Sequence, residues 1–262
     1  MEREEWLQQM RRKAEGLYDQ ISPQYWVTFG FYENETHRAY LQRFLDLVGQ
    51  PGLILSAGCG AGRYDGILLE AGHKVLGIDQ SGGMLKRAQE HFPPERFPQL
   101  RYEKMGLQEI ASREAFDGVI CIDAMEHVSP EDYPHILRNF QEALKPGGML
   151  YFTMDRGEPG ELEEAYARAR AKGLPVVFGE VVDRVDESYS EVNESDQPVT
   201  GGLADTAVYH FYPSLDQAHE WIEQAGLVIE EEGVGSGYHH FLARKKGGSR
   251  DVTLDSKQGS SD

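Results

Sequence analysis

A glycine-rich turn directly follows an apolar run of residues, and this pattern is the clearest candidate for chemistry in the sequence. The run covers residues 53–57, and the turn reads Gly58-Cys59-Gly60-Ala61-Gly62. Glycines let the backbone approach a ligand closely, and a helix that opens after the turn directs free N–H groups at the anionic end of that ligand. The pattern alone indicates a ligand site without identifying the ligand.

A residue with a carboxylate side chain directly follows the next apolar run. Residues 73–78 form this run and Asp79 follows it, 21 positions after Gly58. A carboxylate at the end of a neighbouring strand can accept hydrogen bonds from both hydroxyls of a ribose, which anchors an adenosine. A dinucleotide fingerprint would need a small residue at position 63, where the chain has Arg63. The turn and the carboxylate therefore favour an adenosine ligand over a dinucleotide.

The elements that must position these residues alternate between strand and helix from residue 51 to residue 156. This alternation predicts an α/β fold with a parallel sheet and crossover helices. Ser129-Pro130 predicts a capped helix start, and Ser214 opens a capping box before a helix that Gly226 ends. The expected strands are 53–57, 74–78, 100–105, 118–122, 149–153, 228–233 and 238–244.

Three further regions flank or interrupt this core. Residues 1–48 predict a helical cap, with an apolar face that includes Trp6, Leu7 and Met10 and a break at residues 21–23. Residues 157–207 are an insertion with an expected helix at 161–172 and an expected strand at 176–182. The expected division is a cap at 1–48, a core at 49–156 plus 208–246, a lid insertion at 157–207 and a disordered tail at 247–262.

The charge of the chain restricts its partners. It has 262 residues, with 44 Asp and Glu against 26 Lys and Arg, and a formal net charge of −18. So acidic a protein is not expected to bind nucleic acid. We expect no membrane segment, no signal peptide and a cytoplasmic protein, either monomeric or homodimeric. Cys59 and Cys121 are expected as reduced thiols, and no zinc-ligand spacing or other metal site is predicted.

Four ordered motifs resemble those of the class I S-adenosylmethionine-dependent methyltransferases of the small-molecule type. The glycine turn resembles the first motif, residues 77–81 with Met84 and Leu85 the second, residues 116–123 the fourth, and residues 144–148 the sixth. The resemblance implies a Rossmann-like, doubly wound seven-stranded sheet with an antiparallel last strand. It also implies S-adenosylmethionine as the cofactor and a small organic molecule as the methyl acceptor.

The resemblance also implies which residues bind the cofactor. The glycine turn would lie under the methionine and ribose part, Asp79 would hold the ribose hydroxyls, and Asp123 would border the methionine end. Residues near the adenine would be Gln80, Met84 and 105–107. The full set implied is Tyr18, Tyr25, Ser56, Gly58, Cys59, Gly60, Gly62, Asp79, Gln80, Met84, Met105, Gly106, Leu107 and Asp123.

Position 56 departs from the family pattern. The family usually has Asp or Glu there, which supports the methionine amino group and the turn, whereas this chain has Ser56. A serine still forms hydrogen bonds, but it removes a negative charge that faces a cationic ligand. Weakened cofactor binding is the expected effect of this change.

Three histidines are candidates for a general base that removes a proton from the acceptor. His127 follows the fourth strand, His210 precedes the last helix, and His239 lies at the beginning of the last strand. That beginning lies at the carboxyl edge of the sheet if the last strand runs antiparallel, as in the family. All three are then expected at the carboxyl edge of the sheet, where such folds bind ligands. His127 is the first choice, and a structural role is the alternative for each.

The sequence leaves open the identity of the acceptor and two other functions. Methylation of oxygen or nitrogen is expected, carbon methylation is less favoured, and the insertion together with the cap is expected to cover the acceptor. Residues 155–196 hold 12 acids and five bases, which would favour cationic or neutral acceptors through Glu180, Asp183 and Asp186. A non-catalytic protein that binds the cofactor is the main alternative, and an NAD-dependent oxidoreductase is less favoured because of Arg63.

Overall fold

The computed structural model describes residues 1–26, 34–184 and 207–247. The expected disordered tail lies outside these residues except at Gly247. Among the described helices, none combines the length and the apolar character that a membrane span requires.

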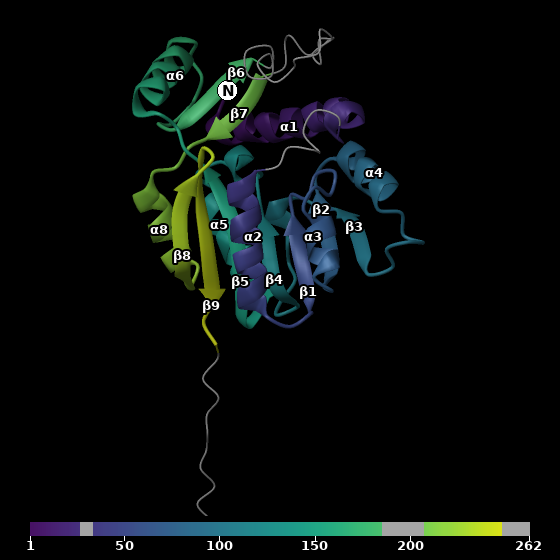
Figure 1. Ribbon diagram of the computed structural model, residues 1–262. Helices are drawn as coiled ribbons and strands as arrows, with labels where there is room; N and C mark the ends of the chain where they lie inside the picture. Colours follow the sequence, from purple (N-terminus) through teal and green to yellow (C-terminus); the bar gives the residue numbers. More distant parts are fainter. Residues whose placement is uncertain (27–33, 185–206, 248–262) are drawn as a thin grey trace, which may run out of the picture.

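A seven-stranded sheet forms the centre of the molecule, in the order β3-β2-β1-β4-β5-β9-β8 (Figure 1). Strand β9 is antiparallel to both of its neighbours, while β1 to β5 pair in parallel. The predicted α/β sheet with an antiparallel last strand is confirmed. The strands are β1 (Leu53–Ala57), β2 (Lys74–Asp79), β3 (Leu100–Lys104), β4 (Phe116–Cys121), β5 (Leu144–Asp155), β8 (Leu227–Gly235) and β9 (Tyr238–Lys245).

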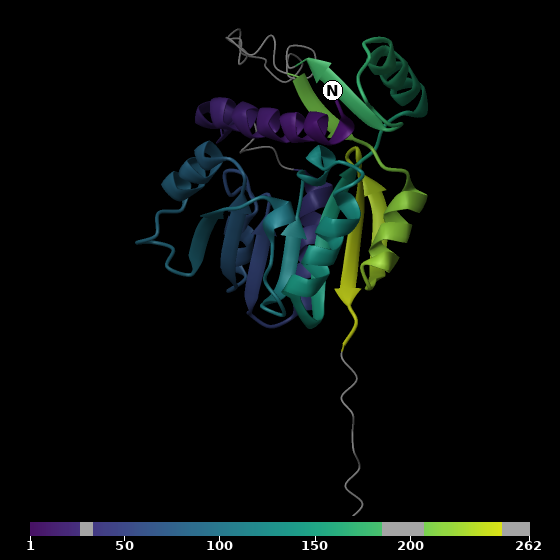
Figure 2. The same cartoon turned by 180° about the vertical axis from the view of Figure 1, so that it is seen from behind.

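Apolar side chains cover both faces of this sheet, since successive residues of a strand point to opposite sides. Leu55 and Val119 belong to a core shared with α5 (Tyr133–Ala143) and α8 (Leu215–Gln224), seen in front of the sheet in Figure 2. Ile54 and Ile120 belong to a second core with α2 (Glu35–Val48) and α3 (Asp65–Glu70). The strands are therefore held rigidly from both sides, and their carboxyl ends form a fixed edge.

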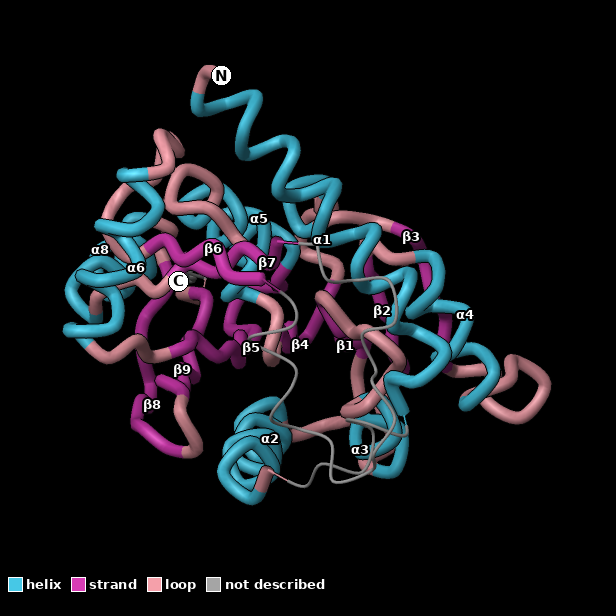
Figure 3. Tube along the Cα trace, turned by 90° about the horizontal axis from the view of Figure 1, so that it is seen from above, coloured by secondary structure: helices cyan, strands magenta, loops and turns pink. Residues whose placement is uncertain are grey.

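Helix α1 (Arg3–Tyr25) crosses this carboxyl edge, above the ends of the strands (Figures 2 and 3). It contacts α4 (Gly82–His91), the helix between β2 and β3. Trp6, Leu7 and Met10 are buried, as the apolar face predicted. The first helix of the chain therefore covers the place where a ligand of such a sheet binds.

The expected break at residues 21–23 does not occur, because α1 continues through Pro23 to Tyr25. A proline inside a helix leaves the carbonyl four residues earlier without its N–H donor. Here that carbonyl belongs to Asp19, and the hydroxyl of Ser22 donates to it at 3.0 Å. The serine before the proline thus replaces the missing hydrogen bond.

Two other element boundaries differ from expectation. Ser129 does not cap α5, since its hydroxyl donates to the carboxylate of Asp132 and the helix begins at Tyr133. The strand expected at 176–182 is β6 (Glu180–Arg184), because the backbone turns at Gly179 with φ of +92°. The capping box at Ser214 is confirmed.

A separate two-stranded sheet accompanies α6 (Pro159–Ala171) within the insertion. It pairs β6 with β7 (Ala207–Phe211) in antiparallel fashion. Strand β7 therefore joins the small sheet, although the sequence assigned residues from 208 onward to the core. The division into domains otherwise stays a prediction.

An ion pair joins this small sheet to α1. The guanidinium of Arg3 donates to both carboxylate oxygens of Glu180, at 2.9 and 2.8 Å. Glu180 is fully buried and also accepts from the hydroxyl of Tyr209 at 2.7 Å. Removing the cation would leave a carboxylate buried without its counter-charge.

We expect the substitution Arg3→Met to lower the free energy of unfolding by about 3–5 kcal/mol, the usual effect of breaking a buried ion pair from one side. Urea unfolding followed by circular dichroism measures this difference. The control Arg12→Met changes an exposed arginine of the same helix and should alter stability by less than about 0.5 kcal/mol. Equal stabilities of the two variants would contradict a stabilising role for the Arg3–Glu180 pair.

Candidate functional site

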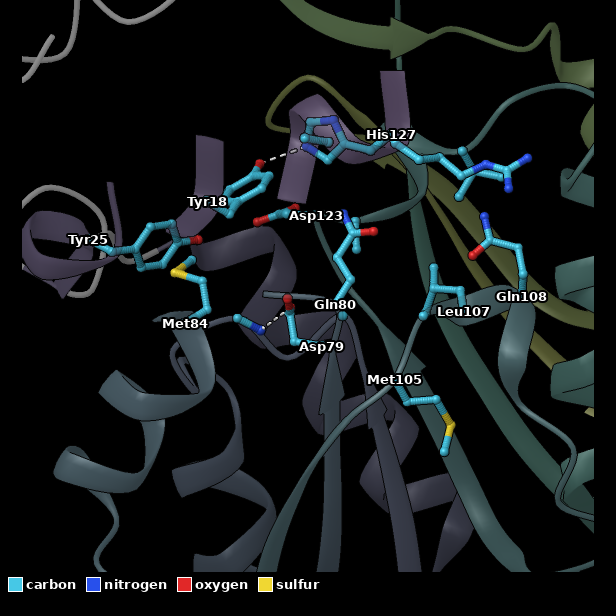
Figure 4. A pocket seen from close by; sticks show the side chains of 17 residues that line it. Tyr18, Tyr25, Asp79, Gln80, Met84, Met105, Leu107, Gln108, Asp123 and His127 are labelled. Atoms are coloured by element: carbon cyan, nitrogen blue, oxygen red, sulfur yellow. Dashed lines mark hydrogen bonds between the residues drawn. The ribbon is translucent and has the colours of Figure 1, made fainter. Parts of the chain in front are cut away.

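A pocket lies at the carboxyl edge of the sheet, between the strand ends and α1 (Figure 4). Most residues that the sequence assigned to the cofactor line it, and His127 lines it as well. Their role in binding stays a prediction. These lining residues are Tyr18, Tyr25, Gly58, Gly60, Asp79, Gln80, Met84, Met105, Gly106, Leu107 and Asp123.

The glycine turn after β1 requires its glycines. Gly58 and Gly60 have φ values of +65° and +54°, a region that other residues rarely adopt. A Cβ atom added to Gly58 would lie 2.6 Å from the side chain of Ala124. The turn therefore exposes bare backbone to the pocket, which suits close approach by a ligand.

Asp79 at the end of β2 holds this turn in place. Its Oδ2 accepts from the N–H of Gly60 at 2.9 Å, and its Oδ1 accepts from the N–H of Ser81 at 2.8 Å. Burial raises the pKa of Asp79, and these two hydrogen bonds oppose that effect. Each carboxylate oxygen has lone pairs for a further donor. The side chain is therefore placed and oriented to accept a pair of ligand hydroxyls.

Asp19 fastens α1 over the pocket. Its Oδ1 accepts from the hydroxyl of Ser81 at 2.6 Å and from the N–H of Gly83 at 2.8 Å. Burial alone would raise the pKa of Asp19, but these hydrogen bonds lower it below its ordinary value. A Cβ atom on Gly83 would lie 3.0 Å from the Cα of Asp19, so the glycine permits this contact. Tyr18 is thereby positioned above the pocket.

Tyr25, one of the last residues of α1, contacts Arg63 beside the glycine turn. The guanidinium donates to the Tyr25 hydroxyl at 3.1 Å and lies 5.6 Å from the centre of its ring. The same arginine lies 3.4 Å from Oδ2 of Asp123. Arg63 therefore connects the cover of the pocket to the end of β4.

Tyr18 and His127 meet inside the pocket (Figure 4). The Tyr18 oxygen lies 2.7 Å from Nε2 of His127, and Nδ1 of His127 lies 3.1 Å from the carbonyl oxygen of Tyr209. A carbonyl only accepts, so Nδ1 carries the proton and Nε2 accepts from the Tyr18 hydroxyl. Burial lowers the pKa of His127, which keeps it neutral. His127 is therefore set up to receive a proton at Nε2.

The other two candidate histidines occupy different places. The His210 ring centre lies 4.9 Å from that of His127, and burial together with His127 lowers the pKa of His210 to about 3. His239 is not among the described residues that line the pocket, and its electrostatic neighbours are Arg156, Glu232 and His219. Only His127 of the three has its ring in the pocket lining.

Asp123 follows β4 in a strained backbone conformation, with φ of +52°. Its N–H donates to the hydroxyl of Thr153 at 2.9 Å, and its Oδ2 accepts from the Tyr64 hydroxyl at 3.3 Å. Burial raises the pKa of Asp123 to about 6, against the lowering effect of Arg63. Its Oδ1 lies 3.4 Å from Nε2 of His37. The carboxyl is thus held at one end of the pocket and can change its charge near neutral pH.

Two further acids lie near this end, Glu126, which is buried, and Asp155, which is half-buried. Burial and the charge of Asp155 raise the pKa of Glu126 well above its ordinary value. Burial and the charge of Asp123 raise the pKa of Asp155 to about 7. Protonation therefore offsets part of the negative charge that the sequence places here.

Three residues of the implied cofactor set do not line the pocket. Ser56 is buried within β1, and Cys59 and Gly62 lie in the glycine turn without lining the cavity. For Ser56 the reason is that its strand position directs it beneath the turn. Cys59 and Cys121 are both free thiols.

Several residues that line the pocket were not predicted from the sequence. Gln108, Ala124 and Val128 follow strands β3 and β4. Arg11 and Ala14 lie on α1, three and four residues apart from each other and from Tyr18. This spacing places them on one helix face with Tyr18, so extending the predicted Tyr18 contact along the helix would have found them.

Comparison with known proteins agrees with this geometry. Residues 54–148 match the family model described as a methyltransferase domain. A ubiquinone biosynthesis O-methyltransferase from Acinetobacter baylyi is 32% identical over 108 residues, which are 40% of this chain and 44% of that protein. One from Albidiferax ferrireducens is 29% identical over 122 residues, 46% and 47% of the two chains. This chain thus matches less than half the length of these curated relatives.

Solved structures share the fold over most of the chain. A methyltransferase from Methanosarcina mazei has a TM-score of 0.62 at 16% identity, covering 78% of this chain and 96% of its own. The magnesium protoporphyrin IX methyltransferase from Synechocystis with bound S-adenosylmethionine has a TM-score of 0.54 at 16% identity, covering 81% and 79%. The family match over residues 54–148 and the strand order together show that this part of the chain is a methyltransferase domain with the class I S-adenosylmethionine-dependent methyltransferase fold.

Proposed function

We propose that the protein transfers a methyl group from S-adenosylmethionine to an oxygen or nitrogen atom of a small organic acceptor. One observation carries this proposal. The glycine turn and Asp79 line the same pocket as Tyr18 and His127. A site for an adenosine-containing cofactor therefore adjoins a neutral histidine that can take up a proton.

The residues present fit S-adenosylmethionine. Gly58 and Gly60 offer bare backbone, and Asp79 offers two carboxylate oxygens for the ribose hydroxyls. Met84 and Leu107 add apolar surface for the adenine. When bound, this cofactor supplies an electrophilic methyl group on a positively charged sulfur.

The protein must then align the acceptor with the methyl group, exclude water and accept the proton that the acceptor loses. Helix α1 covers the pocket, with Tyr18 and Tyr25 in its lining. An acceptor hydroxyl that donates to the Tyr18 oxygen can pass its proton through Tyr18 to Nε2 of His127. The carbonyl of Tyr209 stabilises the resulting imidazolium, because Nδ1–H already donates to it.

The relatives support oxygen as the accepting atom. The curated relatives are named as O-methyltransferases of ubiquinone biosynthesis. A hydroxyl must lose its proton during methylation, and the Tyr18–His127 pair provides a place for that proton. We therefore place hydroxyl acceptors ahead of amines.

We expect Asp79→Asn to weaken the binding of S-adenosylmethionine and S-adenosylhomocysteine by about 10- to 100-fold, because charged hydrogen bonds to the ligand are lost. Calorimetry with both ligands and with NAD in parallel measures this. The control is Asp46→Asn, an exposed acid of α2 that should leave both affinities unchanged. Binding of NAD alone by the unmodified protein would contradict the proposed function.

We expect His127→Gln to lower turnover by about 10²- to 10⁴-fold while S-adenosylhomocysteine still binds normally. Acceptors are found by incubating metabolite extracts with a donor carrying an isotopically labelled methyl group, and rates are measured as S-adenosylhomocysteine formed. His219→Gln, at an exposed position, is the matched control. Unchanged turnover on the identified acceptor would eliminate His127 as the base.

The pH profile provides a second check on His127. Burial lowers its pKa below the ordinary value of a histidine, so kcat/KM should rise with pH, with the midpoint of the rise below that of an exposed histidine. Asp123, with a pKa of about 6, and Asp155, with a pKa of about 7, also titrate nearby. If protonation of His127 causes the fall of kcat/KM at low pH, this fall should be absent from His127→Gln. A decline that persists unchanged would assign it to the carboxyl groups instead.

A further inference from the structure

A buried carboxylate that the proposed mechanism does not use lies directly beneath the glycine turn. Asp65 is the first residue of α3 and is fully buried. Its Oδ2 accepts from the hydroxyl of Tyr102 at 2.8 Å. In the described part of the chain, its Oδ1 has no hydrogen-bond partner and no cationic side chain forms an ion pair with it.

The carboxylate packs against the turn itself. The N–H of Asp65 donates to the carbonyl of Gly62 at 3.2 Å. A Cβ atom on Gly62 would lie 3.2 Å from Oδ2 of Asp65 and 2.6 Å from the Tyr102 hydroxyl. Gly62 therefore leaves the space that lets the carboxylate reach the underside of the turn.

Ser56 faces the same carboxylate from β1. Burial raises the pKa of Asp65 to about 6, and its polar neighbours Ser56 and Tyr102 oppose this rise. Ser56, on β1, is thus turned toward an acid that belongs to the next helix. The resemblance implies an acid at position 56; this chain has a hydroxyl there, and an acid stands nine residues further along the chain.

A buried carboxylate without a counter-charge is costly, and the cost falls when a cation binds nearby. The opposite side of the turn, at Gly58 and Gly60, lines the pocket. The proposed cofactor carries a positive sulfonium, so its binding would supply the missing counter-charge through the thin glycine backbone.

We propose that Asp65 provides the negative charge beneath the glycine turn that favours the cationic cofactor, in place of an acid at position 56. This inference rests on the proposed function. Asp65 acts through the turn and is a positioning residue, while Asp79 holds the turn from the pocket side.

The test compares two ligands that differ in charge. S-adenosylmethionine carries a sulfonium and S-adenosylhomocysteine carries a neutral thioether, so the ratio of their dissociation constants isolates the response to the positive sulfur. Calorimetry near neutral pH should show that Asp65→Asn weakens S-adenosylmethionine about tenfold, or about 1.4 kcal/mol, and S-adenosylhomocysteine by less than about threefold.

An exchange variant tests the relocation of the acid. The pair Ser56→Asp with Asp65→Ser keeps one carboxylate and one hydroxyl in the same buried space. It should restore the ligand ratio of the unmodified protein to within about threefold. Asp46→Asn is the control, because it removes an exposed carboxylate of α2 and should leave the ratio unchanged.

Equal weakening of both ligands in Asp65→Asn would make the residue purely structural and overturn the inference. If Asp65→Asn does not fold, the exchange variant provides the test. A folded exchange variant whose ratio of the two dissociation constants differs from that of the unmodified protein also overturns the inference. Failure of the unmodified protein to bind either ligand would instead refute the proposed function, so the two failures are distinguishable.

Discussion

The carboxylate of Asp19 holds α1 across the carboxyl edge of the sheet, and the pocket depends on this attachment. Its partners, Ser81 and Gly83, stand at the beginning of α4, where a helix has unpaired N–H groups and a partial positive charge. A carboxylate is the side chain best suited to that position. Tyr18 adjoins Asp19 in sequence and Tyr25 follows within the same helix, so the cover and part of the lining are fixed together.

The site could be predicted from the sequence best at positions where the backbone conformation or the place in a strand restricts the residue type. The positive φ angles at Gly58 and Gly60 and the place of Asp79 at a strand end follow directly from the pattern of residues. Long-range side-chain contacts could not be predicted in this way. Pro23 was expected to end α1, yet a single serine hydroxyl repairs the break, and the hydrogen bond between Tyr18 and His127 joins residues 109 positions apart.

One of the acids that the sequence places over the acceptor is not exposed there. Glu180, offered by the sequence as a charge of the lid, is buried and paired with Arg3. The side chain of Asp183 and all of Asp186 lie outside the described residues. Local charge counts fail here because they cannot show which acids burial and pairing remove from the surface. Glu180 is therefore no longer an argument for a preference for cationic acceptors.

The hydrogen bond from Tyr18 to His127 joins the cover of the pocket to its reactive side chain. The tyrosine belongs to α1 and the histidine to the short helix η3 (Met125–His127), which follows β4. Any displacement of α1 from the sheet edge would therefore separate the two rings. The proton relay is complete only in the covered arrangement that the structure shows, so a single contact ties the chemistry of the site to the position of its cover.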